Sequence, residues 1–468
     1  MDTYSQPPQR QLTRPPASRK AAITILALGF SLGAINVHAQ QLSSLMQMVK
    51  THPSVQNATA LAGAAKDEIA VAQAASKLKL GGGVSVADGN SVSGVSSGFA
   101  PQLTATLPLG DGGKTSDNVR AKTALSDAAM TRIRVSEESI GTEVLTLYTQ
   151  VAKQQAVIQA LSQHGSALQV LLDKVKAIAQ IDTGRRSEVL QVQTKLNAVL
   201  SSREESRLIA KQALTKLQQL LQTKVAVTAP IDPPRVNFLI PATMAQAQTL
   251  LANHPALQAA AAESLAAQAR ADAASKWNNP SWALEAAAAS AKDINSGKQK
   301  YLNAVTVRLS ANLDILDGGA GAATANSEAQ LRAGALANIE TVQRNLSSTL
   351  GTELNLLTLR EQRLAQLRAQ VTTANELRVA GFEQFLAGRR ALTEQINFEN
   401  DYFSALIALA GEEVEQQSAP WRLVSALGQL GGVLPSSTKG STTQSGTTTN
   451  NINTTSLQAS TPSTGKPW

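Results

Sequence analysis

The chain has 468 residues, of which only 3% are aromatic, and a formal net charge of +8. Alanine, leucine, glutamine, serine and threonine dominate, which indicates long helices packed through small side chains rather than thick globular cores. Because the chain has no cysteine, disulfide bonds, thiolate metal sites and a lipid-modified N-terminal cysteine are excluded.

Residues 1–39 predict a signal peptide. Four basic residues between Arg10 and Lys20 precede an apolar run over 21–35, and Val37-His38-Ala39 offers a small-residue cleavage site. A retained N-terminal anchor is the alternative. No segment after residue 40 has the roughly 20 apolar residues of a membrane-spanning helix. If the exported chain crosses a membrane, we therefore expect it to do so as strands.

Residues 40–228 are predicted to form one structural unit, which begins with a helix, a strand pair and a turn. Proline in His52-Pro53 suits the first turn of a helix. Apolar and polar side chains then alternate through residues 103–109, which is typical of a strand. Asp111-Gly112-Gly113 predicts a turn, because no Lys-Ser or Lys-Thr follows at the spacing of a phosphate-binding loop.

A long helical hairpin follows in the same unit. No proline occurs between Pro108 and Pro230, so helices can run uninterrupted there. We expect one helix from Asp111-Gly112-Gly113 to Gly184 and a second over about 187–222, with Gly184 as the C-cap and Gly184-Arg185-Arg186 at the tip. The first helix carries heptad-spaced apolar residues: Val144, Val151, Ile158, Leu172, and Leu147, Leu161, Leu168, Val175.

The rest of the chain repeats this pattern after a stiff, proline-rich linker predicted over 229–241. Residues 242–417 form the second unit, whose predicted strand places Val305, Val307 and Leu309 on one face and Thr306, Arg308 and Ser310 on the other. A long helix and a second helix over 391–417 follow. Residues 418–468 are expected to form a disordered, low-complexity tail.

Three landmarks recur in the same order. His52-Pro53 returns as His254-Pro255, Asp111-Gly112-Gly113 as Asp317-Gly318-Gly319, and Gly184-Arg185-Arg186 as Gly388-Arg389-Arg390. The chain is therefore predicted to contain two copies of one unit and four strands in all. Four strands cannot close a membrane barrel, and lipid does not tolerate open sheet edges. Three copies of the chain would supply twelve strands, within the known size range.

The export signal, the two strand pairs and the two hairpins with Gly-Arg tips resemble the TolC-like outer membrane factor family over roughly residues 41–417. The quoted motifs are the two His-Pro pairs, Leu107-Pro108-Leu109-Gly110-Asp111-Gly112-Gly113, and Phe385-Leu386-Ala387-Gly388-Arg389-Arg390-Ala391-Leu392. The resemblance implies an α+β membrane protein with two repeats per chain. Its homotrimer would form a 12-stranded outer-membrane β-barrel continuous with a long periplasmic α-helical barrel. It also implies outer-membrane lipid, a periplasmic adaptor protein and an ABC or proton-driven inner-membrane transporter as partners.

The resemblance further implies that residues at the two tips gate the tunnel. In that family, arginine–aspartate links close the entrance and acidic residues past the second tip ring the pore. Arg390 and Glu394 occupy matching positions, whereas Asn397 stands where the family's best-known member has a second aspartate. The tip and gate candidates are Asp182, Gly184, Arg185, Arg186, Glu188, Gly388, Arg389, Arg390, Glu394 and Asn397, and Arg308 is the lumen-facing strand candidate. Simple helix capping by the tip arginines is the structural alternative.

No enzyme, cofactor or metal ion is predicted. The four histidines do not follow metal-site spacings, and Glu137-Glu138 and Glu412-Glu413 are expected on solvated helix faces rather than as catalytic pairs. No basic patch with interleaved aromatic residues occurs, so nucleic acid is not expected as a partner. The leading hypothesis is a passive exit duct for type I protein secretion or efflux, since the twin arginine tips resemble secretion ducts. The alternatives are the drug or solute efflux duct of a proton-driven pump and a periplasmic or surface coiled-coil scaffold.

Overall fold

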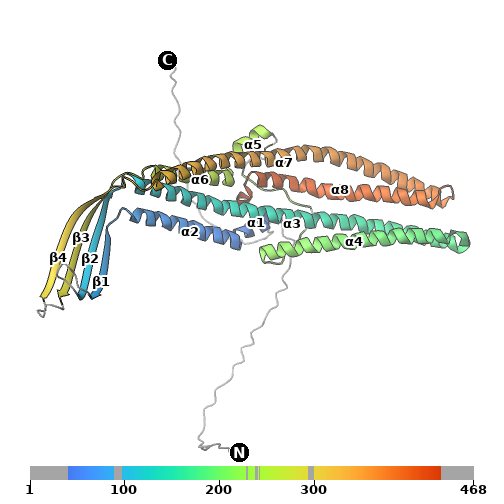
Figure 1. Ribbon diagram of the computed structural model, residues 1–468. Coiled ribbons are helices and arrows are strands. Elements are labelled where there is room, and N and C mark those ends of the chain that lie inside the picture. Colours follow the sequence, from blue (N-terminus) through green and yellow to red (C-terminus); the bar gives the residue numbers. More distant parts are fainter. Residues whose placement is uncertain are drawn as a thin grey trace, which may run out of the picture. The chain divides into compact units, whose positions relative to one another are not determined.

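The computed structural model describes residues 41–88, 97–227, 230–237, 241, 243–293 and 300–433, all within one compact unit that spans Ala39–Trp468. Figure 1 shows long helices that carry a four-stranded sheet at one end and two hairpin tips at the other. The predicted signal peptide, and the predicted tail after residue 433, lie outside the described residues.

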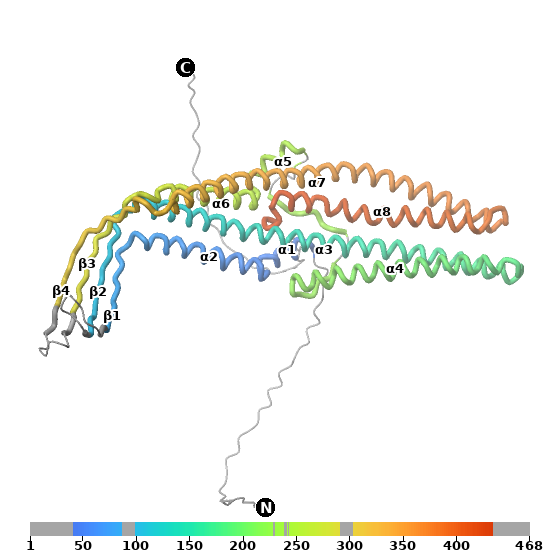
Figure 2. Tube along the Cα trace, in the orientation of Figure 1, coloured from blue at the N-terminus to red at the C-terminus, as the bar shows by residue number. Residues whose placement is uncertain are grey.

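The elements occur twice in the same order, which confirms the two predicted repeats. The first repeat contains α1 (Leu42–Met48), the 3₁₀ turn η1 (Val49–Thr51), α2 (Pro53–Ala74), β1 (Lys79–Asp88), β2 (Ser97–Gly110), α3 (Lys114–Ile181), η2 (Thr183–Arg185) and α4 (Arg186–Leu221). The second contains α5 (Met244–Leu251), α6 (Pro255–Ser275), β3 (Ser281–Asp293), β4 (Lys300–Asn312), α7 (Ala320–Leu386), α8 (Leu392–Ala426) and η3 (Leu430–Gly432). Figure 2 shows α1 beside α3 and α5 beside α7.

The four strands form one antiparallel sheet in the order β1-β2-β3-β4. In the register, Leu103 lies opposite Ala288 and Ala288 opposite Val305, so one face collects apolar side chains. That face is open: Leu103 and Val305 are 67% and 79% exposed. The opposite face carries small or polar residues, as the alternation predicts.

Each strand pair joins its long helix through the predicted Asp-Gly-Gly turn. The Asp111 carboxylate accepts hydrogen bonds from the backbone N–H groups of Gly113 (3.1 Å) and Thr115 (2.7 Å). Asp317 does the same for Gly319 (2.9 Å) and Gly321 (2.5 Å). Both glycines of each turn have positive φ, between 69° and 91°, a backbone conformation that residues other than glycine rarely adopt. The motif therefore turns the chain and caps the following helix at once.

The His-Pro pairs begin α2 and α6, and their histidines are the N-caps. Nδ1 of His52 accepts from the N–H of Ser54 (3.1 Å), and Nδ1 of His254 accepts from the N–H of Ala256 (3.1 Å). Pro53 and Pro255 each occupy the first helical turn, where a missing N–H costs nothing.

The boundary predicted at residue 417 is wrong. Helix α8 continues to Ala426 through Pro420, and η3 follows. Trp421, Val424, Leu430 and Val433 are buried in the main hydrophobic cluster, where they pack with residues of α1, α3 and α4. This burial stabilises the folded chain enough to offset the cost of one proline in a helix. The polar composition after residue 417 therefore does not mark the end of the folded chain.

The predicted linker is also packed against the core in its described part. Ile231 is buried, and its N–H donates to Oε1 of Gln417 (3.0 Å). The carbonyl of Asp232 accepts a hydrogen bond from the indole of Trp421 (2.6 Å). None of the described helices is both long enough and apolar enough to cross a membrane.

Candidate functional site: the hairpin tips and the polar inner surfaces

The first hairpin tip, between α3 and α4, is built around an aspartate rather than a glycine. Asp182 ends α3 with an extended backbone, and its carboxylate accepts from the N–H of Gly184 (3.1 Å). Gly184 does not have positive φ and lies within η2, so its predicted role as the C-cap is wrong. Arg185 binds Glu188 one turn later (Nε–Oε1 3.1 Å), whereas Arg186 is exposed.

The second tip, between α7 and α8, has the predicted glycine cap. Gly388 has φ 72°, its N–H donates to the carbonyl of Phe385 (3.0 Å), and the N–H of Arg389 donates to that of Gln384 (2.9 Å). This pair of hydrogen bonds is a Schellman motif, which satisfies the last carbonyls of the helix. The two tips thus differ in backbone chemistry although both carry Gly-Arg-Arg.

This difference predicts opposite tolerance of alanine. Gly388→Ala should speed up hydrogen exchange of the backbone amides around Gly388 by about tenfold, because a side chain in the left-handed region costs about 1–2 kcal/mol. Gly184→Ala is the matched control: φ there is not positive, and the added Cβ would meet only Oδ1 of the exposed Asp182, 3.2 Å away, so exchange at the first tip should change much less. Equal responses at both tips, measured by mass spectrometry, would contradict the assignment.

Arg390 is held by three side chains of its own hairpin. Its Nε donates to Oε1 of Gln384 (2.8 Å), its guanidinium lies 3.2 Å from Glu394, and it stacks over Phe398 (5.1 Å to the ring centroid). Arg389 and Asn397 are exposed. Arg390 and Glu394 are therefore brought together as a pair, on the same hairpin.

Asn397 belongs to a groove between α4 and α8 close to the tips. The groove has a volume of about 510 Å³ and is lined by Ser187, Leu190, Gln191, Thr194, Lys195, Thr393, Ile396 and Asn397. Leu190 is 65% exposed there. Neutral polar side chains dominate the lining, so the candidate residue Asn397 faces α4 rather than an acidic cluster.

A buried polar cluster that the sequence did not reveal lies above the tips. Arg378 of α7 approaches Glu399 of α8 (3.5 Å), and the amide of Gln395 also donates to Glu399 (3.3 Å). Burial raises the pKa of Glu399, and the Arg378 guanidinium opposes that shift. Next to them, His164 of α3 stacks on Phe403 of α8, with ring centroids 4.3 Å apart. The cluster ties the two hairpins together.

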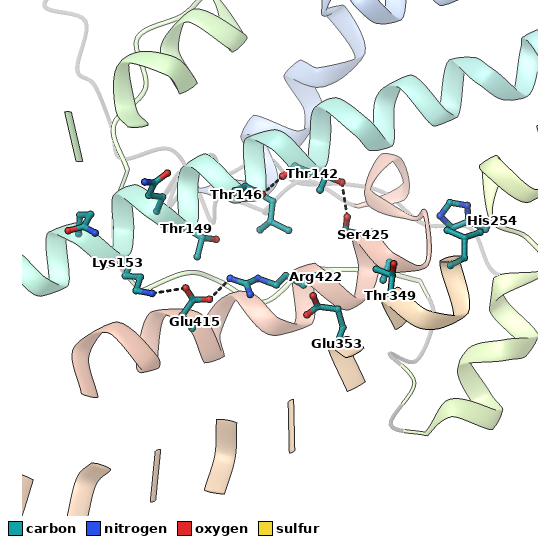
Figure 3. Close-up of a pocket in the computed structure, with 15 residues that line it drawn as sticks. Thr142, Thr146, Thr149, Lys153, His254, Thr349, Glu353, Glu415, Arg422 and Ser425 are labelled. Carbon is teal, nitrogen blue, oxygen red and sulfur yellow. Dashed lines mark hydrogen bonds and ion pairs between the residues drawn. The ribbon is translucent and has the colours of Figure 1, made fainter. Parts of the chain in front are cut away.

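A second polar cluster lines a hollow of about 660 Å³ where α3, α7 and α8 meet the start of α6. Figure 3 shows Thr149 and Lys153 on α3 facing Glu415 and Arg422 on α8. Glu415 binds Lys153 (3.0 Å), Arg360 (3.4 Å) and Arg422. Its pKa is lowered, because these cations outweigh the effect of burial, which raises it. Glu415 and Arg422 are two helical turns apart, but nothing in the sequence pointed to Lys153.

The prediction that the adjacent glutamates lie on solvated faces is wrong for two of them, Glu138 and Glu412. Glu138 accepts from the N–H groups of Leu430 (3.1 Å) and Gly431 (3.0 Å), and burial raises its pKa to about 7. Glu412 is only 11% exposed and lies 3.5–3.6 Å from Arg363 and Arg360. Glu138 thus links α3 to η3, and Glu412 links α8 to α7. No group of three or more metal-ligating residues occurs among the described residues.

Arg308 lies on the polar face of the sheet. Its Nε donates to Oε2 of Glu285 on the neighbouring strand (2.7 Å), and the hydroxyl of Ser310 donates to Oε1 of Glu285 (3.2 Å). The register places Arg308 directly opposite Glu285, so the pair is a cross-strand contact on one face.

Comparison with known proteins agrees with this architecture. A family model described as "Outer membrane efflux protein" matches residues 45–223 and 247–429. "Outer membrane efflux protein BepC" of Brucella suis biovar 1 (strain 1330) is 21% identical over 323 residues, which are 69% of this chain and 70% of that protein.

Solved structures show the same fold. The outer membrane protein VceC of Vibrio cholerae superposes with a TM-score of 0.71 at 16% identity, covering 83% of this chain and 96% of VceC. The CmeC outer membrane channel of Campylobacter jejuni gives 0.72 at 14% identity, covering 91% and 95%.

Proposed function

Because the chain belongs to the outer membrane efflux protein family, we propose that it is the outer-membrane exit duct of a tripartite export system. Three copies would close a 12-stranded barrel in the outer membrane above a helical tunnel in the periplasm. The duct would conduct passively what an inner-membrane transporter and a periplasmic adaptor deliver. The observation that carries the proposal is the sheet, with one exposed apolar face, one polar face and two free edges.

The free edges support closure by further copies. Among the described strands, β1 and β4 each pair on one side only. An exposed edge leaves a row of unpaired backbone groups, which cannot persist in lipid. Pairing of β4 with β1 of another copy would repeat the β2–β3 pairing seen inside the chain.

The different burial of the two long helices, α3 and α7, also supports closure by further copies of the chain. Helix α3 buries 20 residues because it contacts α2, α4, α6 and α8, whereas α7, almost equally long, contacts mainly α6 and α8 and buries four. By the internal repeat, the missing neighbours of α7 correspond to α2 and α4, which make no extensive contact with it in the described chain. Those positions would be filled by α2 and α4 of the next copy.

The second Asp-Gly-Gly turn likewise lacks a neighbour that the first turn has. The turn at Gly112 is covered by Asn279, whose amide donates to the Gly112 carbonyl (3.2 Å). A Cβ at Gly318 or Gly319 would meet nothing within 4 Å, and the adjacent Ile315 and Leu316 are 84% and 90% exposed. The start of the first repeat in another copy would cover this second turn.

Membrane fractionation combined with a heat-modifiability gel tests the assembly. A closed trimer requires detergent for extraction and migrates as a heat-sensitive oligomer. The scaffold alternative predicts extraction without detergent and no stable trimer, and it gives no role to the four-stranded sheet.

The tip residues would act as the gate of this duct. The contacts of Arg390 with Gln384, Glu394 and Phe398 lie within one hairpin, so a latch requires its guanidinium to pair with a carboxylate of a neighbouring hairpin in the closed state. Arg390→Ala would remove that pair, and a partly exposed ion pair contributes up to about 1 kcal/mol. We expect the open population to rise about two- to fivefold, seen as higher mean conductance in planar bilayers. Arg389→Ala, which removes an exposed neighbouring charge, should leave the conductance unchanged. If Arg390→Ala also leaves it unchanged, Arg390 is not a latch.

For the cargo we propose type I protein secretion, supported by the twin arginine tips. The alternative is solute efflux by a proton-driven pump, supported by the groove close to the tips, whose polar lining is mostly uncharged. Deletion of the chain distinguishes them: loss of one exported protein from the medium supports secretion, and increased sensitivity to small toxic solutes supports efflux.

A further inference from the structure

All three charged side chains described in the four strands lie in a single row. The strand residues whose side chains the structure describes are 79–86, 99–110, 281–290 and 303–312, and their charged members are Lys79, Glu285 and Arg308. Lys79 pairs with Thr106, Thr106 with Glu285, and Glu285 with Arg308. Residues directly opposite each other in antiparallel strands project from the same face. One continuous row therefore crosses all four strands.

The row occupies the polar face of the sheet. The next rows on that face carry only small or neutral side chains: Gly81, Thr104, Ala287 and Thr306, then Gly83, Gln102, Ala289 and Ala304. The opposite face is the exposed apolar one, with Leu80, Val305 and Val307 at 69–79% exposure. Lys79 and Arg308 are thus the longest side chains on a face otherwise lined by short ones.

The charges of the row do not cancel. Glu285 is matched by Arg308, which donates to it at 2.7 Å. Lys79, at the helix-proximal end of β1, is exposed and forms no ion pair with any described residue. Each chain therefore adds one net positive charge at this level of the sheet.

We propose that this row forms an anion-favouring electrostatic ring near the base of the barrel, with Lys79 as its determining residue. The inference rests on the proposed function, since it requires that copies of the chain close the sheet with the polar face inward. A ring of like charges inside low-dielectric walls focuses its field on the lumen and raises the local concentration of counter-ions. Chloride, or the carboxylate and phosphate groups of an anionic cargo, would be favoured over cations there.

The test is the reversal potential of the full-length protein in planar bilayers under a KCl gradient. Lys79→Gln should lower the chloride-to-potassium permeability ratio about two- to fivefold relative to the wild type. Glu285→Gln should raise the ratio, because it leaves Arg308 unmatched. The difference from the wild type should shrink between 0.1 M and 1 M salt, since the Debye length falls from about 10 Å to 3 Å.

Two further variants separate charge from folding. Lys79→Arg keeps the charge and should retain the wild-type ratio. Lys50→Gln removes the same charge at an exposed position of η1, and should also leave the ratio unchanged. If Lys79→Gln conducts with the wild-type permeability ratio, or if Lys79→Arg loses as much selectivity as Lys79→Gln, the proposed ring is wrong. The proposed function as an exit duct would not be affected by either result. If the wild-type protein forms no channel at all, the proposed function fails and the ring fails with it.

Discussion

Replacing Trp421 with alanine is expected to lower the free energy of unfolding by about 3–5 kcal/mol. Trp421 is fully buried, and it packs in the main hydrophobic cluster with Leu217, Val227 and Val424. Its indole N–H donates to the carbonyl of Asp232 at 2.6 Å, so the substitution also leaves that carbonyl without its partner. Chemical denaturation of the detergent-solubilised protein, followed by circular dichroism, measures the loss.

Trp421→Phe is the matched variant, because it keeps an aromatic ring but removes the hydrogen-bond donor. It should cost about 1–2 kcal/mol, and the difference from alanine isolates the packing contribution. A Trp421→Ala protein as stable as the wild type would show that this part of α8 does not belong to the core. That outcome would restore the sequence-based boundary at residue 417.

The boundary illustrates what the sequence could predict and what it could not. The Asp-Gly-Gly turns, the His-Pro starts and the glycine cap at Gly388 depend on local backbone chemistry, which a few residues specify. The end of α8 depends instead on burial of Trp421 by residues of α3, α4 and the linker, which are distant in the chain. These tertiary contacts are invisible in one sequence, which is why the sequence predicts an end at residue 417, before Pro420.

The same reasoning applies to the candidate site. The recurrence of Gly-Arg-Arg predicts the two tips and the family resemblance predicts their gate residues, yet Gly184 and Gly388 adopt different conformations. Identical tripeptides diverge there because Asp182 precedes one of them and supplies its own cap. The clusters around Glu399 and Glu415 join three helices, and heptad spacing indicates which face of a helix is apolar but not which charged residue meets another across it.

The stability of the protein is expected to fall at low pH because of His164, which belongs to the polar cluster above the tips. The ring is 5% exposed, stacks on Phe403, and its Nε2 has no hydrogen-bond partner. Burial lowers the pKa of His164 from 6.5 to about 4. Its contribution to stability is therefore complete above pH 6.5 and is lost as the pH falls through 4, with a total of about 3 kcal/mol.

Comparison with His164→Phe isolates this contribution, because the variant keeps an aromatic ring against Phe403 but has no titratable group. We expect similar unfolding free energies at pH 7, and a variant more stable than the wild type by about 2–3 kcal/mol near pH 4. Glu399 titrates in the opposite sense, since its raised pKa adds stability at low pH, but it is present in both proteins and cancels in the difference. If the two pH curves run parallel, His164 is already accessible to protons in the folded state and does not hold α3 against α8 through a neutral ring. If they diverge as expected, acidification alone would loosen the contact between the two hairpins, a motion that opening of the tunnel also requires.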